Sequence, residues 1–460
     1  MSRWPRVAVV GGSLGGLTAA LVLRDLGCQV DVFERSAVEL ESRGAGIVVL
    51  DETVRYFRER TDRELDQLTT ATGVLRYLGR DGRVVYEEPR RYRYSSWHTL
   101  YRALLGCFGR RRYHLGKELA GFHQQGEHVE LRFADGTTAG CDLLVCADGI
   151  ASQARAVLQP QARPAYAGYV AWRGTVDERQ LSRGVRDLLA DSICYQVIPN
   201  SHILVYPIPA LDGSVATGRR LANFVWYRNY VVGRELEDLM TDRYGTRRDL
   251  TLPPGAAREA HLEELRTGAA VLLAPQFTEV VQRCKLPFVQ VIFDIEVTQM
   301  VFGRVCLIGD AAFALRPHAA AGTAKAAADA WALADTLATT QGDLQAALPR
   351  WERHQLAVGR AVLERTRRNG NKSQVESTWR PGDPDLVFGL YEPGRWVSGA
   401  GHRGVGGVGG VEGMACYSVG GLGVRGGEGR GHVTRHGQWL LRSRRARSVA
   451  ACRYPAYLAG

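Results

Sequence analysis

The sequence predicts an α/β protein in which a domain of parallel strands and helices is interleaved with a mostly antiparallel β-sheet. Three observations predict this fold class. Residues 6–35 show the order strand, glycine-rich turn, helix and strand, and residues 166–297 are rich in aromatic and β-branched side chains. After Gly303 a buried-strand pattern returns, and an alanine-rich helix follows it. The first and third patterns are typical of one Rossmann-like domain, which the middle segment interrupts.

The first element is the segment RVAVVGGSLGGLTAALVLRDLGCQVDVFER, which begins at Arg6. Its apolar run is typical of a buried strand, and the stretch up to Gly27 favours a helix. The turn between them has the frame Gly11-x-Ser13-x-x-Gly16, with a serine where the fingerprint G-x-G-x-x-G has its central glycine. Such a turn, with the helix N-terminus after it, attracts a pyrophosphate through free N–H groups and the helix dipole.

Ser13 is compatible with this role, because the middle position requires only a small residue and the hydroxyl can itself donate to a phosphate oxygen. Glu34 closes the second strand, where an acid can hold the hydroxyl pair of a ribose. A structural turn with a surface glutamate is the alternative interpretation. The order of strand, turn, helix, strand and acid favours a dinucleotide, but it does not distinguish NAD from FAD.

The next segments continue this first part of the chain. Helices are expected at 51–65 and 97–108, and Asp135-Gly136 marks the turn of a hairpin. A strongly apolar strand at 143–147 follows and ends in the motif CADG. The Asp148-Gly149 pair of this motif is weak evidence for a ligand by itself.

Residues 166–297 differ in character from the segments on either side. The stretches AGYVAWRGTV, SICYQVIPNSHILVYPIP, ANFVWYRNY and PFVQVIFDIEV predict strands of a mostly antiparallel sheet. One helix is expected within this region, at 257–273.

The pattern that returns in RVCLIGDAAFALRPHAAAGTAKAAADA favours a flavin. Asp310 follows a buried strand, where a carboxylate can accept hydrogen bonds from polyol hydroxyls such as those of a ribityl chain. The helix predicted at 320–339 would direct its N-terminal dipole at the negatively charged edge of a reduced flavin ring. A simple helix N-cap is the alternative for Asp310. A further helix is expected over 344–370, broken or restarted at Pro349.

Together, the glycine turn, the Asp148-Gly149 pair and Asp310 resemble the motifs of the single-component flavoprotein aromatic hydroxylases, the family of para-hydroxybenzoate hydroxylase. The resemblance covers residues 5–390. It implies that Asp148 contacts both FAD and NAD(P)H, and that Asp310 binds the ribityl chain. Two positions depart from the family pattern, because Phe313 replaces a histidine and Trp97 replaces an arginine that contacts FAD. The residues expected to bind FAD are Gly11, Ser13, Leu14, Gly16, Glu34, Arg35, Gly46, Ile47, Asp148, Asp310, Pro317, Gly322 and Thr323.

The resemblance also implies the reaction, in which NAD(P)H reduces FAD, O₂ reacts with the flavin, and one oxygen atom reaches an electron-rich ring. Within the family, ERSAVELESRGAGIVVL, YAGYVAWRG and RPHAAAGTAKAAADA are similar to members that hydroxylate dihydroxypyridines, which implies a small aromatic or N-heteroaromatic substrate. An epoxidase or halogenase-like enzyme of the same fold is one alternative, although the W-x-W-x-I-P signature of halogenases is missing. A non-catalytic nucleotide- or RNA-associated protein is another.

Four side chains are candidates for ionising the substrate. His202 and Tyr206 lie on one predicted strand of the sheet, and His318 and Lys325 lie beside the predicted flavin helix. Histidine suits proton transfer because its ordinary pKa is about 6.5, yet each of the four can also have a purely structural role. The aromatic residues that could line the pocket, or equally pack in the core, are Trp172, Tyr195, Trp226 and Phe293.

The length and composition of the chain indicate more than one domain. The chain has 460 residues, of which 45% are hydrophobic, so it has room for two or three domains. We expect a discontinuous FAD-binding domain at 1–165 and 298–345, a substrate domain at 166–297 and a helical segment at 346–395. Residues 396–460 are rich in glycine and arginine, which predicts a disordered tail or a C-terminus altered by a shifted reading frame.

The distribution of charge and of cysteines indicates which binding partners and which subcellular location to expect. Most of the net charge of +11 lies in residues 396–460, where aromatic residues are not interleaved with the RGG sequence, so nucleic acid is a weak candidate. No apolar run reaches the roughly 20 residues of a membrane span, and the first residues show no signal-peptide pattern. Nine scattered cysteines, without a C-x-x-C pair or a metal-ligand spacing, predict a reduced cytoplasmic protein without a metal site. A homodimer is compatible with the sequence.

Overall fold

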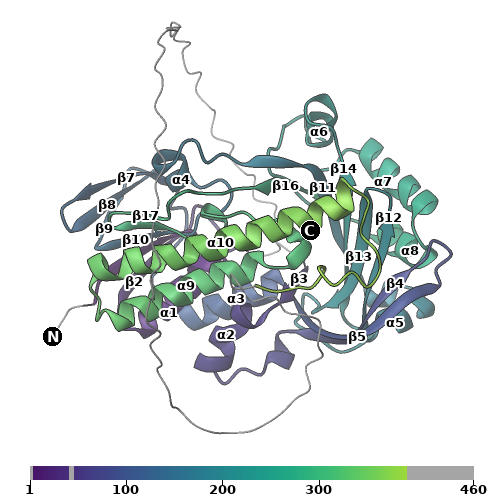
Figure 1. Ribbon diagram of the computed structural model, residues 1–460, viewed down its shortest axis with the longest axis horizontal. Helices are drawn as coiled ribbons and strands as arrows, with labels where there is room; N and C mark the ends of the chain where they lie inside the picture. Colours follow the sequence, from purple (N-terminus) through teal and green to yellow (C-terminus); the bar gives the residue numbers. More distant parts are fainter. Residues whose placement is uncertain (1–3, 41–45, 391–460) are drawn as a thin grey trace, which may run out of the picture. The chain divides into compact units, whose positions relative to one another are not determined.

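The computed structural model describes residues 4–40 and 46–390. The tail predicted at 396–460 therefore lies outside the described residues, as do the last positions of the segment predicted at 346–395. Two sheets dominate the described part of the chain, and long helices lie against them (Figure 1). This arrangement confirms the predicted α/β fold class.

The first sheet has six strands in the order β17-β18-β10-β1-β2-β6. The pairs from β18 through β6 are parallel, and β17 is added antiparallel at the edge. Its strands are β1 (Arg6–Val10), β2 (Gln29–Phe33), β6 (Tyr113–His114), β10 (Leu143–Cys146), β17 (Val301–Phe302) and β18 (Val305–Leu307). A three-stranded sheet, β7 (Leu119–Gln125), β8 (His128–Phe133) and β9 (Thr138–Cys141), contributes side chains to the same core.

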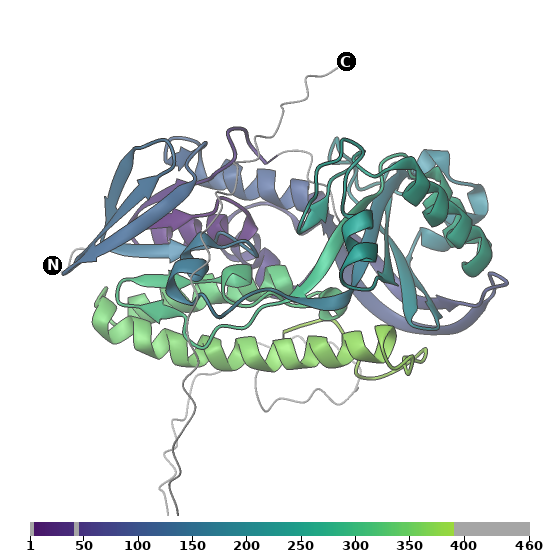
Figure 2. The same cartoon turned by 90° about the horizontal axis from the view of Figure 1, so that it is seen from above.

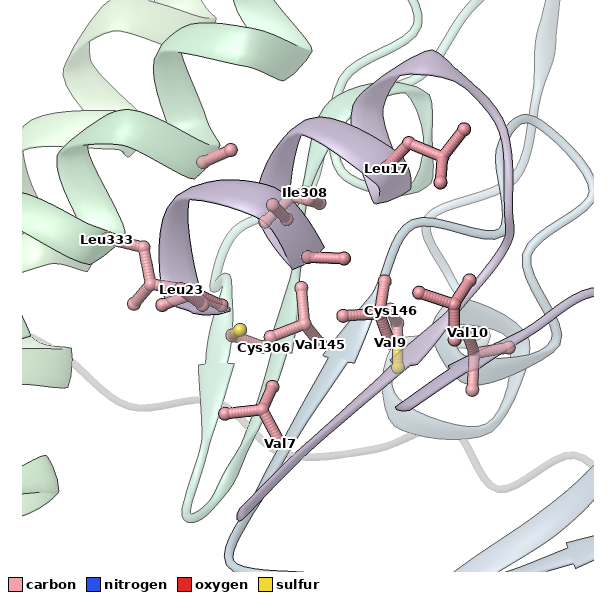
Figure 3. Packing of buried hydrophobic residues seen from close by; sticks show 14 of the residues in the cluster. Val7, Val9, Val10, Leu17, Leu23, Val145, Cys146, Cys306, Ile308 and Leu333 are labelled. Carbon is pink, nitrogen blue, oxygen red and sulfur yellow. The ribbon is translucent and has the colours of Figure 1, made fainter. Parts of the chain in front are cut away.

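The core of this part forms because its strands are apolar on both faces, as a parallel sheet covered on both sides requires. Val9, Val145 and Cys306 are fully buried at the centre. Leu17 and Leu23 on helix α1 (Leu14–Asp25) pack against them, as Figure 3 shows. Helices α3 (Trp97–Phe108) and α9 (Gly322–Thr339) in turn pack against α1. The glycine turn is thereby fixed at the carboxyl end of β1.

The second sheet has nine strands in the order β15-β16-β11-β14-β13-β12-β4-β5-β3. All pairs are antiparallel except β12 with β4. The strands are β3 (Gly46–Val49), β4 (Thr70–Leu78), β5 (Val84–Ser96), β11 (Ala165–Asp177), β12 (Ser192–Ile198), β13 (Ser201–Ile208), β14 (Leu221–Asn229), β15 (Thr251–Leu252) and β16 (Phe288–Asp294). The first three come from the segment that the sequence assigned to the FAD-binding domain, and the domain boundaries stay a prediction.

The two faces of this second sheet differ. Alternate residues of each strand point to opposite faces, and one face packs against helices α5 (Arg183–Leu189), α6 (Arg234–Leu239), α7 (Glu259–Leu272) and α8 (Pro275–Arg283). The other face, called the aromatic face from here on, carries a cluster of six tyrosines, Tyr77, Tyr94, Tyr169, Tyr195, Tyr206 and Tyr227. The single helix expected at 257–273 is thus followed by α8, a second helix with Pro275 in its first turn, where proline is tolerated.

Two further helices differ from the expected pattern. Helix α2 (Asp51–Arg60) ends earlier than the helix predicted at 51–65, and the 3₁₀-helix η1 (Leu65–Gln67) follows it. Helix α10 (Leu344–Gln374) continues through Pro349 without a break, because this exposed proline lies near the helix start and water can reach the carbonyl group that it leaves unpaired. Figure 2 shows α10 running beside both sheets. Among the described residues, no helix is both long and apolar enough to cross a membrane.

Candidate active site

The turn between β1 and α1 is built from close backbone contacts. Gly11 has a φ of +102°, and a Cβ atom there would overlap the carbonyl group of Ala147, at the end of β10. A Cβ atom on Gly16 would overlap the carbonyl oxygen of Gly11. Ser13 is the N-cap of α1, and its side chain makes no capping hydrogen bond. The N–H groups of the first helical turn, which begins at Leu14, have no partners within the helix and can bind phosphate oxygens.

Glu34 is buried, not exposed as the alternative interpretation supposed. Its carboxylate accepts hydrogen bonds from the N–H groups of Gly12 and Ser36, each at 2.9 Å. The Tyr113 hydroxyl donates to the carbonyl oxygen of Gly12 at 2.9 Å, a contact that sequence reasoning missed. The neighbouring Arg35 is exposed. Glu34 therefore ties the glycine turn to the end of β2.

The Asp-Gly turn after β10 contains an unsatisfied acceptor. Asp148 Oδ2 accepts from the N–H of Gln153, at the start of α4 (Gln153–Leu158), at 2.9 Å. Asp148 Oδ1 is buried and has no hydrogen-bond partner among the residues that the structure describes, and burial raises the pKa of this carboxyl group. The buried Arg155 donates to the carbonyl oxygens of Ile150 and Ala311, the second at 3.1 Å. It thus connects the Asp-Gly turn to the turn that carries Asp310.

Asp310 lies on the 3₁₀-helix η3 (Gly309–Ala311), directly after β18. Burial raises the pKa of Asp310 to about 6, with Asp329 adding to the shift and Lys325 opposing it. Gly309 has a φ of +58° and donates its N–H to Asp329 Oδ2 at 2.8 Å. The turn is therefore held from α9 by the carboxylate of Asp329.

Lys325 forms a buried ion pair with that same carboxylate. Its Nζ lies 2.7 Å from Asp329 Oδ2, and the two side chains are 1% and 0% exposed. Because the ammonium group is occupied by Asp329, the geometry favours a structural role for Lys325 over the proton-transfer role expected from the sequence. The spacing of four residues on one helix could have indicated this pair.

The start of α9 follows a strained turn. Pro317 begins the 3₁₀-helix η4 (Pro317–Ala319), and Ala320 has a φ of +55°, which is uncommon for a residue with a Cβ atom. Helix α9 begins at Gly322 without a side-chain cap, so its first N–H groups are free of intrahelical partners. Thr323 Oγ1 lies 3.4 Å from Thr53 Oγ1 on α2. Backbone strain of this kind is found mostly at ligand-binding positions.

The two histidines predicted from the sequence lie close together on the aromatic face. The rings of His202 on β13 and His318 on η4 lie 5.3 Å apart, and both are buried. The Tyr169 hydroxyl lies 2.7 Å from His318 Nε2, whereas the buried His318 Nδ1 has no hydrogen-bond partner within residues 4–40 and 46–390. His202 Nδ1 contacts Ser373 Oγ of α10 at 2.6 Å. The predicted Tyr206 stacks on Tyr94, at 4.6 Å between ring centres, on the same face.

Burial favours the neutral form of both histidines. Burial lowers the pKa of His318 to about 3, and the positive charge of Arg316 adds to the shift. Burial also lowers the pKa of His202 well below its ordinary value, and the neighbouring His318 contributes. A neutral imidazole has one acceptor nitrogen and one donor nitrogen. The pair can therefore both accept and donate hydrogen bonds to a ring with hydroxyl groups.

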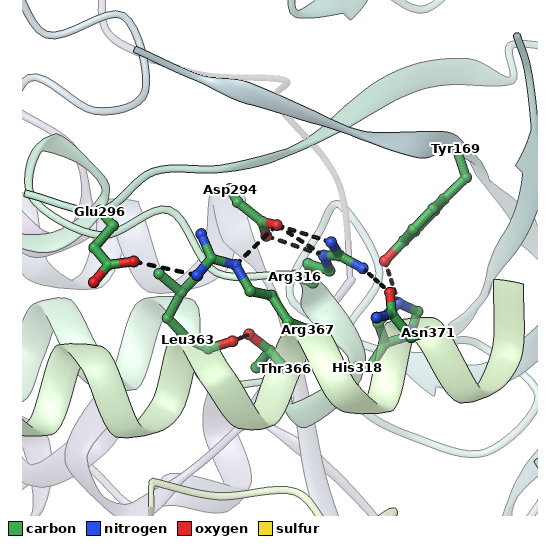
Figure 4. Close-up of polar contacts among 9 residues, drawn as sticks. All are labelled: Tyr169, Asp294, Glu296, Arg316, His318, Leu363, Thr366, Arg367 and Asn371. Carbon is green, nitrogen blue, oxygen red and sulfur yellow. Dashed lines mark hydrogen bonds and ion pairs between the residues drawn. The ribbon is translucent and has the colours of Figure 1, made fainter. Parts of the chain in front are cut away.

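Arg316 fixes the turn that carries His318 (Figure 4). Its guanidinium donates to the Asp294 carboxylate at 3.0 and 2.8 Å, and to Asn371 Oδ1 on α10 at 2.9 Å. Arg367 of α10 also donates to Asp294, at 3.1 Å. Sequence reasoning did not identify these ion pairs, although the arginine precedes the Pro-His pair in the segment RPHAAAG.

The aromatic residues proposed from the sequence are divided between the two faces of the sheet. Trp172, Trp226 and Phe293 belong to the core on the helix-covered face. Tyr195 alone lies on the aromatic face, where its ring stacks on Tyr77 at 5.3 Å. Trp379, which follows α10, packs against His202 at 4.6 Å and closes this face, and it was missed because no periodic pattern marks its segment.

Gly46 is held by two residues of the aromatic face. Its N–H donates to Asn223 Oδ1 at 2.9 Å, and its carbonyl oxygen accepts from Arg173 Nη2 at 2.8 Å. A Cβ atom at Gly46 would lie 2.6 Å from the Asn223 side chain, so only glycine fits. Ile47 is the next residue of β3. Sequence reasoning singled out Gly46 and Ile47 but neither Arg173 nor Asn223.

Comparisons with known proteins agree with this geometry. A family model described as FAD binding domain matches residues 5–209 and 293–366, and one described as FAD binding domain-like matches residues 166–294. The 2,6-dihydroxypyridine 3-monooxygenase of Paenarthrobacter nicotinovorans is 40% identical over 386 residues, which cover 84% of this chain and 96% of that protein. Salicylate hydroxylase of Pseudomonas putida is 32% identical over half of each chain.

A solved structure gives the same result. The structure of 2,6-dihydroxypyridine-3-hydroxylase from Arthrobacter nicotinovorans is similar with a TM-score of 0.80 at 38% identity, over 85% of this chain and 99% of that one. The fold and the site define a flavin-dependent monooxygenase. The chain belongs to the FAD binding domain family. These findings support the hydroxylase interpretation and not the epoxidase, halogenase-like or RNA-associated alternatives.

Proposed function

We propose that this protein hydroxylates a small aromatic or N-heteroaromatic ring, with a dihydroxypyridine as the first candidate, using FAD, NAD(P)H and O₂. The observation that carries the proposal is the pair of buried histidines, His202 and His318, with rings 5.3 Å apart on a face lined with aromatic side chains near the start of α9. A flat ring can stack on such side chains, and its hydroxyl groups can pair with the imidazoles. The relative that is 40% identical bears a dihydroxypyridine in its name.

The residues present fit FAD. The glycine turn has a backbone that only small residues permit, and the free N–H groups at the start of α1 suit a pyrophosphate. Asp148 Oδ1 is a buried acceptor without a partner, and Asp310 is a carboxylate in a site that disfavours its charge until donors arrive. We infer that Asp310 accepts hydrogen bonds from the ribityl hydroxyls and that the N-terminus of α9, at Gly322 and Thr323, faces the flavin ring.

The chemistry that FAD supplies when bound is reduction by NAD(P)H and activation of O₂ for transfer of oxygen to the ring. The task of this chain is to hold and ionise the substrate and to exclude water. We propose that His318 Nδ1, which has no hydrogen-bond partner among the described residues, accepts a hydrogen bond from a substrate hydroxyl, while Tyr169 fixes the imidazole through Nε2. Arg316 keeps the turn that carries His318 in place. The predicted homodimer belongs to this proposal as well, and light scattering on the holoenzyme checks it.

The purified protein tests the function directly. We expect a yellow protein with a flavin absorption spectrum, whose NADH or NADPH oxidation accelerates strongly when 2,6-dihydroxypyridine or a related phenol is added. The measurements are the flavin spectrum, the rate of NAD(P)H oxidation and the mass of the product, which should increase by one oxygen atom. A colourless protein that FAD does not reconstitute would refute the proposal, as would a flavoprotein that no member of a panel of hydroxylated rings stimulates.

The variant His318→Gln is expected to reduce the rate of ring hydroxylation by about 100-fold, because the imidazole that positions the substrate hydroxyl is lost and misplacement of a reacting ring has a cost of this size. The FAD content should stay the same, because the His318 side chain lies on the aromatic face and its substitution leaves the glycine turn unchanged. His354→Gln, on an exposed position of α10, is the matched control and should turn over normally. Product formation per bound flavin is the measurement. Equal rates for His318→Gln and the wild type would exclude the role of His318.

The pH dependence of FAD binding tests Asp310. The pKa of this carboxyl group is raised from 3.8 to about 6 in the folded protein. The free energy of unfolding of the protein without FAD should therefore decrease as the pH rises from about 4 to 6, because Asp310 ionises less readily in the folded state than in the unfolded state. Flavin hydroxyls donate to the ionised form, and FAD affinity should therefore fall about tenfold from pH 7 to pH 5. Asp310→Asn should bind FAD weakly and without this dependence.

Two measurements check this prediction, namely fluorescence titration of FAD into protein without flavin, and thermal unfolding of that protein between pH 4 and 7. Asp187→Asn, which removes an exposed carboxylate on α5, should match the wild type throughout. If Asp310→Asn retained the wild-type dependence of FAD affinity on pH, another group would be responsible.

A further inference from the structure

Arg173 on β11 is a cation whose hydrogen-bond partners among the described residues are all neutral. Its Nη2 donates to the carbonyl oxygen of Gly46 at 2.8 Å, and its Nη1 donates to Gln290 Oε1 at 2.9 Å. Its Nε is buried and has no hydrogen-bond partner in the part of the chain that the structure describes. A guanidinium of limited exposure normally pairs with a carboxylate or with a ligand anion. Its charge is therefore available to a ligand.

Asn223 on β14 supplies a second, independent observation. Its side chain is fully buried, and its Oδ1 accepts the N–H of Gly46 at 2.9 Å. Because a backbone N–H can only donate, this contact fixes the orientation of the amide and leaves Nδ2 as a donor. Asn223 Nδ2 is buried and has no hydrogen-bond partner among the described residues. A buried donor without an acceptor is rare in folded proteins, so an acceptor from a ligand is the simplest completion.

The two donors lie together on the aromatic face. Arg173 and Asn223 are on adjacent strands, and both contact the backbone of Gly46. Asn223 pairs in register with Tyr206 of β13. Burial raises the pKa of Tyr206 to about 12, and the nearby charge of Arg173 opposes the shift. Tyr227 connects these donors with the histidines, because its ring lies 4.9 Å from that of His318 and the charge of Arg173 acts on its hydroxyl. A ring bound on this face can therefore present one oxygen to Arg173 and another to His318.

We propose that Arg173 and Asn223 form an anion-binding subsite that takes the ionised hydroxyl oxygen of the aromatic substrate. The inference rests on the proposed function and specifies its substrate class, a ring that carries one ionised hydroxyl group and a second hydroxyl able to pair with His318. An ionised hydroxyl makes a ring richer in electrons, which favours oxygen transfer to the neighbouring carbon. Neutral ethers of the same ring lack the charge and should be discriminated against.

The test compares two ligands of the oxidised holoenzyme, 2,6-dihydroxypyridine and 2,6-dimethoxypyridine, which has no hydroxyl to ionise. Binding is measured from the change in the visible flavin spectrum, with FAD content measured on each variant. Arg173→Met should weaken binding of the dihydroxy compound about 10- to 100-fold, as expected for a lost charged hydrogen bond, and leave the dimethoxy compound unchanged. Arg173→Lys should retain most of the affinity. Arg179→Met, which removes an exposed arginine just after β11, is the control.

A second variant covers the case in which Arg173→Met does not fold. Asn223→Asp keeps the acceptor for Gly46 and adds a carboxylate that neutralises Arg173. This variant should therefore weaken the binding of the dihydroxy compound to a similar degree. Equal affinity for that compound in the wild type, Arg173→Met and Asn223→Asp would overturn the subsite. An anionic oxygen of the cofactor ring is the other source of the same chemistry. A lowered flavin potential in Arg173→Met, with unchanged affinity for the dihydroxy compound, would assign the subsite to the cofactor and overturn the proposal for substrate.

The wild type separates this inference from the proposed function. A yellow wild-type enzyme that binds neither this ligand nor any other hydroxylated ring refutes both. A wild type that binds and hydroxylates the ring, with an Arg173→Met variant of equal affinity for the dihydroxy compound, refutes the subsite alone.

Discussion

The variant Gly16→Ala is expected to be purified without FAD. A Cβ atom at this position would overlap the carbonyl oxygen of Gly11, and neither can move alone, because the backbone that carries them is fixed between β1 and α1. Relief of the overlap must move the helix start away from the turn, and the N–H groups that would hold the pyrophosphate move with it. Overpacking of this kind costs about 1–3 kcal/mol of folding stability. The measurements are flavin absorbance per chain and the free energy of unfolding in urea.

The matched control is Gly106→Ala. Gly106 lies on α3 with no atom within 4 Å of a Cβ at that position, so alanine fits and improves the helix by up to about 1 kcal/mol. The control should be yellow and at least as stable as the wild type. If Gly16→Ala kept a full complement of FAD, the glycine turn would not be the pyrophosphate site.

The second large effect concerns stability. Lys325→Met is expected to lower the free energy of unfolding by about 3–5 kcal/mol, because it leaves the buried carboxylate of Asp329 without its cation. The carboxylate also accepts the N–H of Gly309, so the turn that carries Asp310 should loosen and FAD should bind less tightly. Urea unfolding and FAD titration measure the two effects.

The double variant Lys325→Met with Asp329→Asn distinguishes structure from catalysis. The asparagine has no charge and can still accept the N–H of Gly309, so most of the lost stability should return. Hydroxylation per bound flavin should return with it. A double variant that is stable and holds FAD but does not turn over would restore Lys325 as a proton-transfer group.

Much of the cofactor side of the site could be predicted from local sequence. The glycine turn, Asp148 and Asp310 each follow a buried strand directly, and strands of a parallel sheet end at the same edge. The position of each of these groups therefore follows from the short segment in which it lies, namely from the strand directly before it. The contacts of Glu34 and Arg155 could not be read in this way, because their partners are backbone groups of distant turns.

The substrate side was predicted less well. Strand alternation shows that Trp172 and Tyr195 lie on some face of a sheet, but it does not show which face the helices cover. In the structure α7 and α8 cover the face of Trp172, and Tyr195 remains on the face with the histidines. The packing of the sheet also brings Arg173 and Asn223 into contact with Gly46, although the three residues are far apart in the chain.

The α/β class, the glycine turn and the acids that follow the strands depend on residues close together in the chain, so they could be predicted before the fold was known. Three features became evident only in the folded chain: the ion pair of Lys325 with Asp329, the unpaired nitrogen of His318, and the set of tyrosines on the same face as His318. Pairing and burial depend on how the nine-stranded sheet packs against α10 and the 3₁₀-helix η4, and no local pattern contains that packing.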